Sequence, residues 1–286
     1  MPDLRLTPST ACFTVDSVNL GGLATYRNPK PLTTFANRLE GRVTFVTGAS
    51  SGIGAAAVRL FAAEGAIVVA AARRIDRIES LAAELCQQGR KVSAVECDVR
   101  DEESVLQAVA FAVKTQRRLD CAFNNAGVGG AHRLLHELST AAFDDVMRTN
   151  LRGVFLCMKY EIAAMLERGS GSIVNTSSIG GLVGGSLNSD YSASKFGLEG
   201  LVRCAALDYA RAGIRVNAIA PGPTRSEMFD RWISTEEARA AMAERFPMNY
   251  IAEPDDMARA ALFLLSDESR WTTGVILPCE GGRSAG

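Results

Sequence analysis

The chain has 286 residues, of which 47% are hydrophobic, and its formal net charge at pH 7 is −1. A chain of this length can bury one large core, and its near-neutral charge gives no electrostatic basis for binding nucleic acid or an anionic membrane. Its longest apolar run, 66–72, is too short to cross a bilayer, and no stretch near the start resembles a secretory signal. We therefore expect one large α/β domain.

The cysteines and histidines do not indicate a disulfide framework or a metal centre. The seven cysteines are odd in number, scattered and never in a Cys-x-x-Cys pair, so we expect small buried residues of a reducing compartment, the cytoplasm. His132 and His136 stand four residues apart, but no HExxH motif or nearby cysteine completes a zinc site. The sequence predicts no metal site.

Residues 1–38 differ in composition from the rest of the chain. They are rich in Thr, Ser, Pro and Asn without a helix or strand period, and Pro29 and Pro31 exclude regular structure near their end. We expect an N-terminal extension that is an arm or partly disordered, followed by one domain over 39–286. A transit peptide, against which two early aspartates argue, and an arm reaching a neighbouring subunit are the alternatives.

From residue 42 onward, short apolar runs alternate with segments of helical period. The strand-like runs are 43–47, 66–72, 91–97, 119–124, 172–177, 215–220 and 275–279. Strands apolar on both faces and separated by helices predict an α/β fold, a doubly wound, seven-stranded parallel sheet flanked by helices. Ligands of such sheets bind beyond the carboxyl ends of the strands, so the residues just after each strand are the informative ones.

The first strand leads into a glycine-rich turn, Thr-Gly-Ala-Ser-Ser-Gly-Ile-Gly at 47–54. Three glycines let backbone N–H groups approach a pyrophosphate at a helix N-terminus, where the helix dipole favours negative charge. The candidate ligands are Gly48, Ser50, Ser51, Gly52, Ile53 and Gly54. The GxxxGxG spacing differs from the GxGxxG of larger dinucleotide-binding proteins, and for the turn alone a structural role is the alternative.

The second strand ends in Ala72-Arg73-Arg74, which bears on cofactor choice. An acid at this point would bind the ribose hydroxyls of NAD(H), whereas arginine attracts the 2′-phosphate of NADP(H). We therefore predict NADP(H) in preference to NAD(H), with Arg73 and Arg74 as ligands. Solvated arginines at a helix start are the alternative, and the nearby Asp76 keeps NAD(H) open.

Three further polar groups follow strands or interrupt a helix. Asp98 and Val99 follow the third strand and are candidates to meet an adenine edge, and the Asn-Asn-Ala-Gly run at 124–127 follows the fourth. Gly127 permits close cofactor approach, although turn chemistry alone would also explain both groups. Asn150 lies in a helical segment expected at about 141–168, where an asparagine is unfavourable unless its amide makes a bond or bends the helix.

The fifth strand delivers the Ser178 hydroxyl to the same crevice as Tyr191 and Lys195. Residues from 191 onward have helical apolar spacing, which places Tyr191 and Lys195 on one helix face. A cation beside a phenol favours the phenolate, so Tyr191 is a candidate general acid and base. For the pair alone, an accidental Tyr and Lys four residues apart is the alternative.

Taken together, these motifs resemble the short-chain dehydrogenase/reductase family over about residues 39–283. The matching features are the 47–54 turn, Asp98-Val99, Asn124 to Gly127, Asn150, the Ser178/Tyr191/Lys195 set, Pro221-Gly222 and Gly281-Gly282. The resemblance implies a single Rossmann-type domain and a short-chain alcohol dehydrogenase or ketoreductase. It also implies a dimer or tetramer built through the helices near 141–168 and 191–212, in which Cys157, Met158, Met165, Leu201 and Ala205 serve the interface or the monomer core.

The resemblance also implies a role for each matching residue. Tyr191 would exchange a proton with the substrate oxygen and Ser178 would hydrogen-bond that oxygen. Lys195 would lower the Tyr191 pKa and hold the nicotinamide ribose, and Asn150 would anchor a water leading to solvent. The implied cofactor contacts are Asp98, Val99, Asn124, Asn125, Ala126, Gly127, Tyr191, Lys195, Ile219, Pro221, Gly222, Thr224 and Ser226. Thr224 and Ser226 depart mildly from the family pattern, and Glu280 replaces the usual Asp without an assignable role.

The substrate is less constrained by the sequence than the cofactor. Residues 128–136, 180–188 and a lid at about 223–250 should close the crevice. The lid carries Met228, Phe229, Trp232, Ile233, Met242, Phe246, Met248 and Tyr250, which suit a small, largely apolar ketone or secondary alcohol. Packing within the lid itself is the alternative for about half of them. A thioester on a carrier protein, a steroid, a sugar and a polyketide-type ketone remain open.

Two other classes of function compete with the oxidoreductase. A descendant without redox chemistry would use the nucleotide as a structural element and act as a cyclase or ligand-binding protein. The intact set of Ser178, Tyr191 and Lys195 argues against this. The third class is an interaction module built around residues 1–38.

Overall fold

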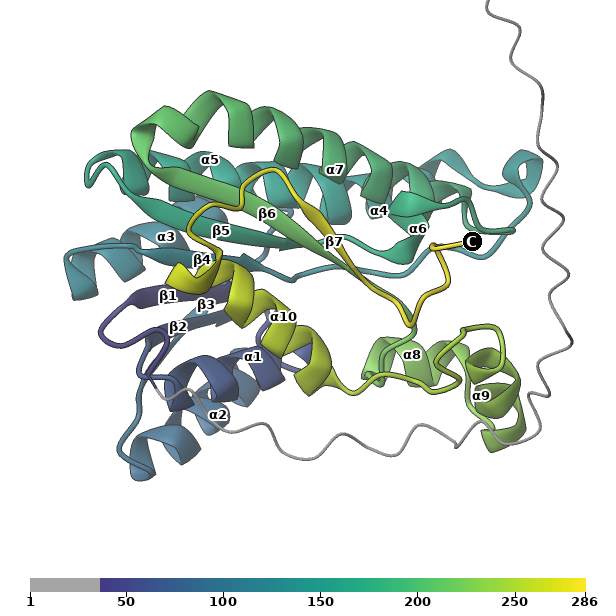
Figure 1. Cartoon of the computed structure of the whole chain (residues 1–286), viewed down its shortest axis with the longest axis horizontal. Helices are drawn as coiled ribbons and strands as arrows, with labels where there is room; N and C mark the ends of the chain where they lie inside the picture. Colours follow the sequence, from purple (N-terminus) through teal and green to yellow (C-terminus); the bar gives the residue numbers. More distant parts are fainter. Residues whose placement is uncertain (1–36) are drawn as a thin grey trace, which may run out of the picture. The chain divides into compact units, whose positions relative to one another are not determined.

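The computed structural model describes residues 37–286, so most of the predicted arm lies outside the described residues. The strands are β1 (Val43–Thr47), β2 (Ile67–Ala72), β3 (Lys91–Glu96), β4 (Cys121–Asn124), β5 (Gly171–Thr176), β6 (Ile214–Pro221) and β7 (Ile276–Cys279). They form one parallel sheet in the order β3-β2-β1-β4-β5-β6-β7 (Figure 1). The predicted seven-stranded parallel sheet is confirmed, and each strand lies within two residues of its expected bounds.

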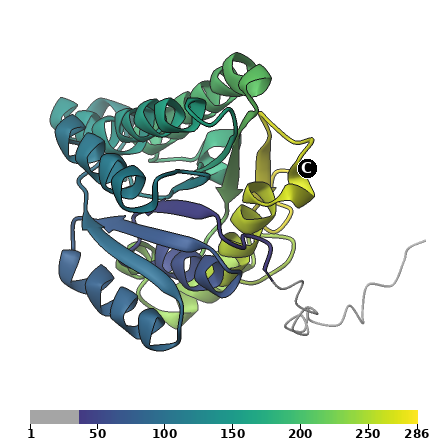
Figure 2. The same cartoon turned by 90° about the vertical axis from the view of Figure 1, so that its left-hand side faces the viewer.

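Helices cover both faces of the sheet, as the doubly wound prediction requires (Figure 2). One face carries α3 (Glu102–Gln116), α4 (Thr140–Met147), α5 (Gly153–Leu166) and α7 (Ser189–Tyr209), and the other carries α1 (Gly52–Ala63), α2 (Ile75–Gln87) and α10 (Pro254–Leu265). Short helices follow at α6 (Ile179–Leu182), α8 (Glu227–Trp232), α9 (Glu236–Ala243), η1 (Leu135–Glu137), η3 (Ala210–Ala212) and η4 (Asp267–Ser269). The chain reverses its direction of winding between β1 and β4, and this reversal opens a crevice at their carboxyl ends.

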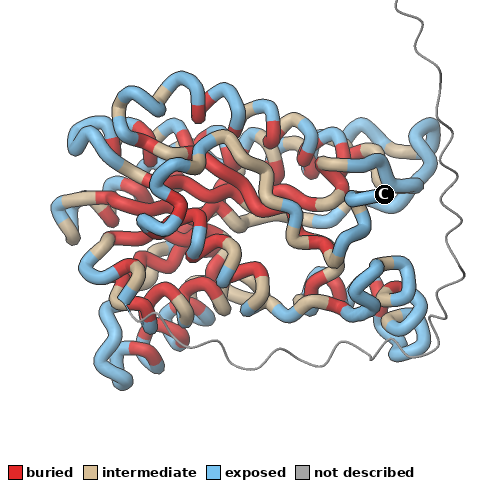
Figure 3. Tube along the Cα trace, in the orientation of Figure 1, coloured by how far each residue is buried: buried red, intermediate tan, exposed pale blue. Residues whose placement is uncertain are grey.

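A separate hydrophobic core lies on each face of the sheet. Successive strand residues alternate between them, so Val43 and Phe45 belong to the core beneath α3, α5 and α7, and Val46 belongs to the core beneath α1, α2 and α10. Figure 3 shows the strands buried along most of their length between helices whose outer faces are exposed. This double burial explains why the strands read as continuous apolar runs rather than as alternating ones.

The expected helix at about 141–168 is in fact two helices. A π-helical turn, η2 (Arg148–Arg152), separates α4 from α5. Within it the Asn150 side chain is fully buried and donates to and accepts from the backbone of Val128. An extra residue in the helical turn is typical of functional sites, and here it directs Asn150 toward the loop after β4.

The expectation of buried cysteines holds for part of the set. Cys97, Cys121 and Cys157 are buried, but Cys86 and Cys204 are exposed, so the prediction is wrong for these two. Cys12 lies outside the described residues. Within residues 37–286, no helix has the length and apolar character to span a membrane, and no group of three or more His, Cys, Asp or Glu side chains is placed to hold a metal ion.

Candidate active site

The crevice is centred where the loops after β1 and β4 meet. The Thr47 hydroxyl accepts from the backbone N–H of Asn125 (3.1 Å) and of Ala126 (3.3 Å). This bond ties the glycine-rich turn to the Asn-Asn-Ala-Gly loop. The sequence analysis gave Thr47 no role of its own. A hydroxyl at the last position of β1 could have been predicted to contact the neighbouring loop.

The turn after β1 forms a cradle that only glycine can line. A Cβ on Gly48 would lie 2.8 Å from the Ala126 backbone, and one on Gly54 would lie 2.1 Å from the Gly48 carbonyl oxygen. Ser51 makes no side-chain cap bond at the N-terminus of α1, and the first turn holds no acidic side chain. The N–H groups of this turn are therefore open to an anion, and the residues present fit the pyrophosphate of a dinucleotide.

The two arginines after β2 occupy different surroundings. Arg73 is exposed, whereas Arg74 donates to the hydroxyls of Ser50 and Ser51, each at 2.8 Å, and to a carboxylate oxygen of Glu227 at 2.8 Å. Arg74 thus lies directly over the glycine-rich turn. Glu227 begins the lid helix α8, and sequence reasoning did not identify it.

The polar residues after β3 and β4 divide between crevice and core. Asp98 forms an ion pair with Arg100 at 2.7 Å, and the Val99 side chain is buried in the core. Asn124 does not line the crevice as the resemblance implied, because its side chain is buried and its Nδ2 donates to Glu161 (2.9 Å) and Asn175 (3.1 Å).

Ser178, Tyr191 and Lys195 come together at the carboxyl end of β5. Ser178 is the N-cap of α6, where its hydroxyl accepts from the Gly180 N–H at 3.0 Å, and it also interacts with the phenol of Tyr191 in α7 and lowers the pKa of that phenol. Lys195 lies one helical turn later, is 4% exposed, and donates from Nζ to the Thr176 carbonyl at 2.7 Å. Its Nζ is 5.5 Å from the centroid of the Tyr191 ring. Two hydroxyls and an ammonium therefore share one pocket.

The electrostatics of this pocket differ from the sequence expectation. Burial raises the pKa of Tyr191 and outweighs the hydrogen bond from Ser178, which lowers it. Burial also lowers the pKa of Lys195 to about 8, since an ammonium is poorly solvated there. In this state Lys195 does not bring the Tyr191 pKa below its usual value, so at neutral pH the phenol is protonated and can donate a proton.

Asn150 connects the pocket to the loop after β4. Its Oδ1 accepts from the Val128 N–H at 2.8 Å, and its Nδ2 donates to the Val128 carbonyl at 2.9 Å. A Cβ on Gly127 would lie 3.3 Å from that oxygen and 3.9 Å from Lys195 Nζ. Glycine at 127 thus lets the main chain pass close to the Asn150 side chain, whereas a Cβ would be only in ordinary contact with the ammonium. The water that the resemblance assigns to Asn150 stays a prediction.

The loop after β6 closes the crevice on its other side. Pro221 ends β6, Gly222 packs against the Glu280 backbone, and the Ser226 hydroxyl caps α8 by accepting from Phe229. Thr224 is buried, and the Ile219 side chain lies wholly in the core rather than near the crevice. Glu280 now has a role, because its carboxylate accepts from the backbone and hydroxyl of Ser284.

The apolar lid residues serve two different purposes. One half packs into a small core of the lid itself: Phe229, Ile233, Met242 and Phe246. The other half is exposed: Met228, Trp232, Met248 and Tyr250. About half of the apolar lid side chains therefore pack within the lid, and the other half are exposed and available to a substrate.

The lid helix α8 lies against the loop that follows Gly127, and this loop also contacts Tyr191. The His132 and Trp232 rings stack with centroids 5.3 Å apart and an interplanar angle of 5°. A Cβ on Gly129 would touch Met228 at 3.8 Å, and one on Gly130 would lie 3.1 Å from the Tyr191 Cβ. Aromatic and thioether side chains of α8 therefore lie beside the loop after β4.

Residues 48–284 match a family model described as enoyl-(acyl carrier protein) reductase. A curated relative from Streptomyces virginiae, an A-factor type γ-butyrolactone 1′-reductase, is 46% identical over 246 residues, which cover 85% of this chain and 96% of the relative. The chain belongs to the short-chain dehydrogenase/reductase family. This membership implies a nicotinamide cofactor, for which the cradle of α1 is suited.

Other members of the short-chain dehydrogenase/reductase family are nearly as similar. A cyclohexanol dehydrogenase from Acinetobacter is 37% identical over 239 residues, covering 84% of this chain and 93% of that protein. The crystal structure of a levodione reductase superimposes with a TM-score of 0.82 at 36% identity, covering 86% of this chain and 98% of the other.

Proposed function

We propose that the protein is an NADP(H)-dependent oxidoreductase that interconverts a ring ketone and its secondary alcohol. The observation that carries this proposal is the hydroxyl pair of Ser178 and Tyr191 with Lys195 buried beside it. A protein without redox chemistry would not need two hydroxyl groups and a buried ammonium near a dinucleotide-binding turn.

Each of these residues has a chemical task in carbonyl reduction. The bound nicotinamide supplies the hydride. Tyr191, protonated at neutral pH, donates a proton to the substrate oxygen, and Ser178 donates a hydrogen bond to the same oxygen. Negative charge grows on that oxygen during the reaction, so both donors stabilise the transition state more than the ground state. Lys195, held by the Thr176 carbonyl, is placed to bind the nicotinamide ribose.

The preference for NADP(H) rests on the positive charge after β2. Replacing Arg73 by alanine is expected to raise the Kd of NADPH by about tenfold to hundredfold, because a charge-assisted phosphate contact contributes about 1–3 kcal/mol. The Kd of NADH should stay within about twofold. Arg259→Ala, which removes an exposed arginine on α10, is the matched control for titration calorimetry. Equal weakening of both cofactors would contradict the assignment.

Two observations favour a small cyclic substrate. They are the names of the relatives and the apolar side chains that lie near Tyr191. The relatives' names specify a γ-butyrolactone and cyclohexanol, both of which contain a ring. Met228 and Trp232 present exposed apolar side chains beside the loop that adjoins Tyr191. Flat aromatic and thioether surfaces bind a compact apolar ring well.

The test measures NADPH oxidation with pairs of ketones matched in carbon number. We expect kcat/KM for cyclohexanone to exceed that for 2-hexanone by about tenfold, which corresponds to about 1.4 kcal/mol in the transition state. Cyclohexanol with NADP⁺ should give the reverse reaction. Failure of every ketone and alcohol in the panel, or a preference for open chains, would contradict the proposal.

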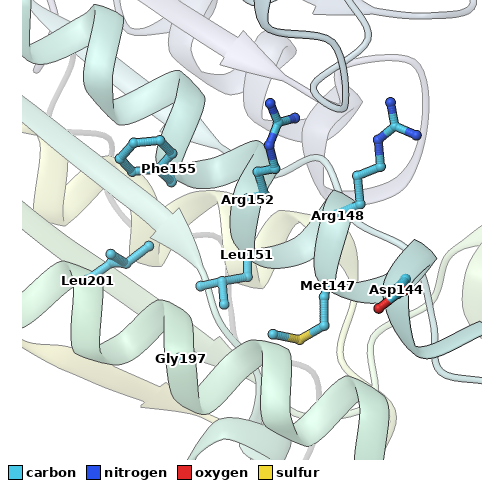
Figure 4. A pocket seen from close by; sticks show the side chains of 8 residues that line it. All are labelled: Asp144, Met147, Arg148, Leu151, Arg152, Phe155, Gly197 and Leu201. Carbon is cyan, nitrogen blue, oxygen red and sulfur yellow. The ribbon is translucent and has the colours of Figure 1, made fainter. Parts of the chain in front are cut away.

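We further propose that the face formed by η2, α5 and α7 joins two copies of the chain. A hollow of about 500 Å³ lies there, lined by Asp144, Met147, Arg148, Leu151, Arg152, Phe155, Gly197 and Leu201 (Figure 4). Phe155 is 47% exposed although it is a large apolar side chain. Of the residues named from the sequence for this interface, Cys157, Met158, Met165 and Ala205 lie in the monomer core, and Leu201 lines the hollow.

Phe155→Glu is expected to shift the protein from dimer or tetramer to monomer, because the interface would then bury a carboxylate in place of an apolar ring. Light scattering after size-exclusion chromatography measures the mass. Leu106→Glu, on the exposed surface of α3, is the control and should leave the mass unchanged. A monomeric wild type, or a Phe155→Glu variant with wild-type mass, would refute this interface.

A further inference from the structure

The lid is tied to the cofactor-binding arginines by one carboxylate. Glu227 is the first residue of α8, and its Oε2 accepts from Arg74 at 2.8 Å while its Oε1 accepts from Arg77. These hydrogen bonds lower the pKa of Glu227 to about 2, so the group is ionised at neutral pH. Both carboxylate oxygens are thus held by guanidinium groups beside the glycine-rich turn.

Arg74 has a second set of partners within the cofactor cradle. Its Nε and Nη2 bond the Ser50 hydroxyl, and Nη2 also bonds Ser51, while Nη1 holds the lid. A Cβ on Gly52 would lie 3.1 Å from the Ser226 Cβ, so the start of α8 is packed against the turn itself. One guanidinium therefore joins the phosphate cradle, the end of β2 and the substrate lid.

Charge favours an incoming anion at this point. Arg73, Arg74 and Arg77 lie within five residues of one another, Arg73 is exposed, and Glu227 pairs with the other two. Carboxylates and phosphates are alternative partners for the same guanidinium fork, since both offer paired anionic oxygens. A phosphate bound to Arg74 would lie close to the Glu227 carboxylate, and like charges at such range repel.

We propose that Glu227 is a latch that substitutes for the cofactor's 2′-phosphate at Arg74, so that a 2′-phosphorylated nucleotide displaces it and frees the lid. This inference rests on the proposed NADP(H) dependence and adds a specificity-determining residue to it. Nucleotides without the 2′-phosphate leave the latch closed. Met228 and Trp232 lie on the same helix, so displacement of Glu227 changes the wall of the substrate crevice.

The affinity test uses two nucleotides that differ only in the 2′-phosphate, 2′,5′-ADP and 5′-AMP. In Glu227→Gln the repelling charge is lost while the shape is kept, so we expect 2′,5′-ADP to bind about tenfold more tightly than in wild type. Binding of 5′-AMP should change by less than about twofold. Glu236→Gln, which removes an exposed lid carboxylate on α9, is the matched control and should alter neither Kd.

The conformational test uses Trp232 as a reporter. The chain has two tryptophans, and Trp271 is 99% exposed, so Trp271→Phe leaves Trp232 as the single tryptophan, which is excited selectively at about 295 nm or above, without disturbing packing. Because Trp232 stacks on His132, release of α8 should change its emission. We expect 2′,5′-ADP, but not 5′-AMP, to produce that change, and Glu227→Gln to show it without any nucleotide.

The outcomes separate this inference from the proposed function. If wild type binds 5′-AMP as tightly as 2′,5′-ADP, the NADP(H) assignment fails. If wild type prefers 2′,5′-ADP but Glu227→Gln binds it no more tightly, or more weakly, the latch is refuted while the cofactor assignment stands. An unchanged Trp232 signal with saturating 2′,5′-ADP also refutes the latch.

Discussion

Tyr191→Phe is expected to lower kcat for ketone reduction by about 10²- to 10⁴-fold, the usual contribution of a positioned general acid. The variant retains the ring but loses the hydroxyl that bonds Ser178, so substrate oxygen receives no proton from the protein at this position. The Kd of NADPH should change by less than about threefold, because Lys195 and the α1 cradle are untouched. Stopped-flow absorbance and fluorescence titration measure the two quantities.

Tyr209→Phe is the control for this experiment. Tyr209 is the last residue of α7, the helix that carries Tyr191 near its start, so loss of the Tyr209 hydroxyl should leave kcat unchanged. Wild-type turnover in Tyr191→Phe would exclude Tyr191 as the acid. If the variant processed a ligand normally while NADPH was not consumed, the non-redox alternative would be favoured instead.

Glu161→Gln is expected to make stability less dependent on pH. Glu161 lies in α5 with no exposed surface, accepts from Asn124 Nδ2 at 2.9 Å through one oxygen, and has no partner for the other among the described residues. Desolvation raises the pKa of Glu161 to about 8 from its ordinary value of 4.5. The folded protein therefore holds a proton that the unfolded chain releases.

The sign of the effect follows from this difference in proton uptake. Between the unfolded and folded pKa values the folded state binds more protons, so the free energy of unfolding falls as pH rises from about 4.5 to about 8 and then levels off. At about 1.4 kcal/mol per pKa unit, the wild type loses roughly 3–5 kcal/mol across this interval. Glutamine does not titrate, so the variant lacks this loss and becomes the more stable protein at pH 9.

Urea unfolding of both proteins at pH 5.5, 7 and 8.5 measures this difference, and other titrating groups cancel in the comparison. The free energy of unfolding of Glu161→Gln, relative to that of wild type, should rise with each step in pH. Glu237→Gln, on the exposed surface of α9, should differ from wild type in free energy of unfolding by the same amount at each pH. A constant gap for Glu161→Gln as well would mean that the carboxyl is ionised in the folded protein.

One helix assignment from the sequence failed, at a point where tertiary contacts override local preference. A continuous helix is the natural prediction for 141–168, yet Asn150 exchanges two hydrogen bonds with Val128 and the helix opens into a π-turn there. Asn124 and Asn125 are adjacent and chemically identical. Their side chains point to opposite sides because successive strand residues alternate, and the packing of α5 brings Glu161 to Asn124 on the core side, while Asn125 Nδ2 donates to the Gly48 carbonyl.

The strand positions, the glycine-rich turn and the spacing of Ser178, Tyr191 and Lys195 were all readable from the chain, because apolar runs and close backbone approach leave strong local patterns. Three other properties could not be read from the chain. They are the raised pKa of Tyr191, the division of the lid's apolar side chains into buried and exposed, and the bond between Glu227 and Arg74. Burial and ion pairing depend on groups far apart in sequence, and Glu227 lies 153 residues from Arg74. Such properties exist only once the elements have packed.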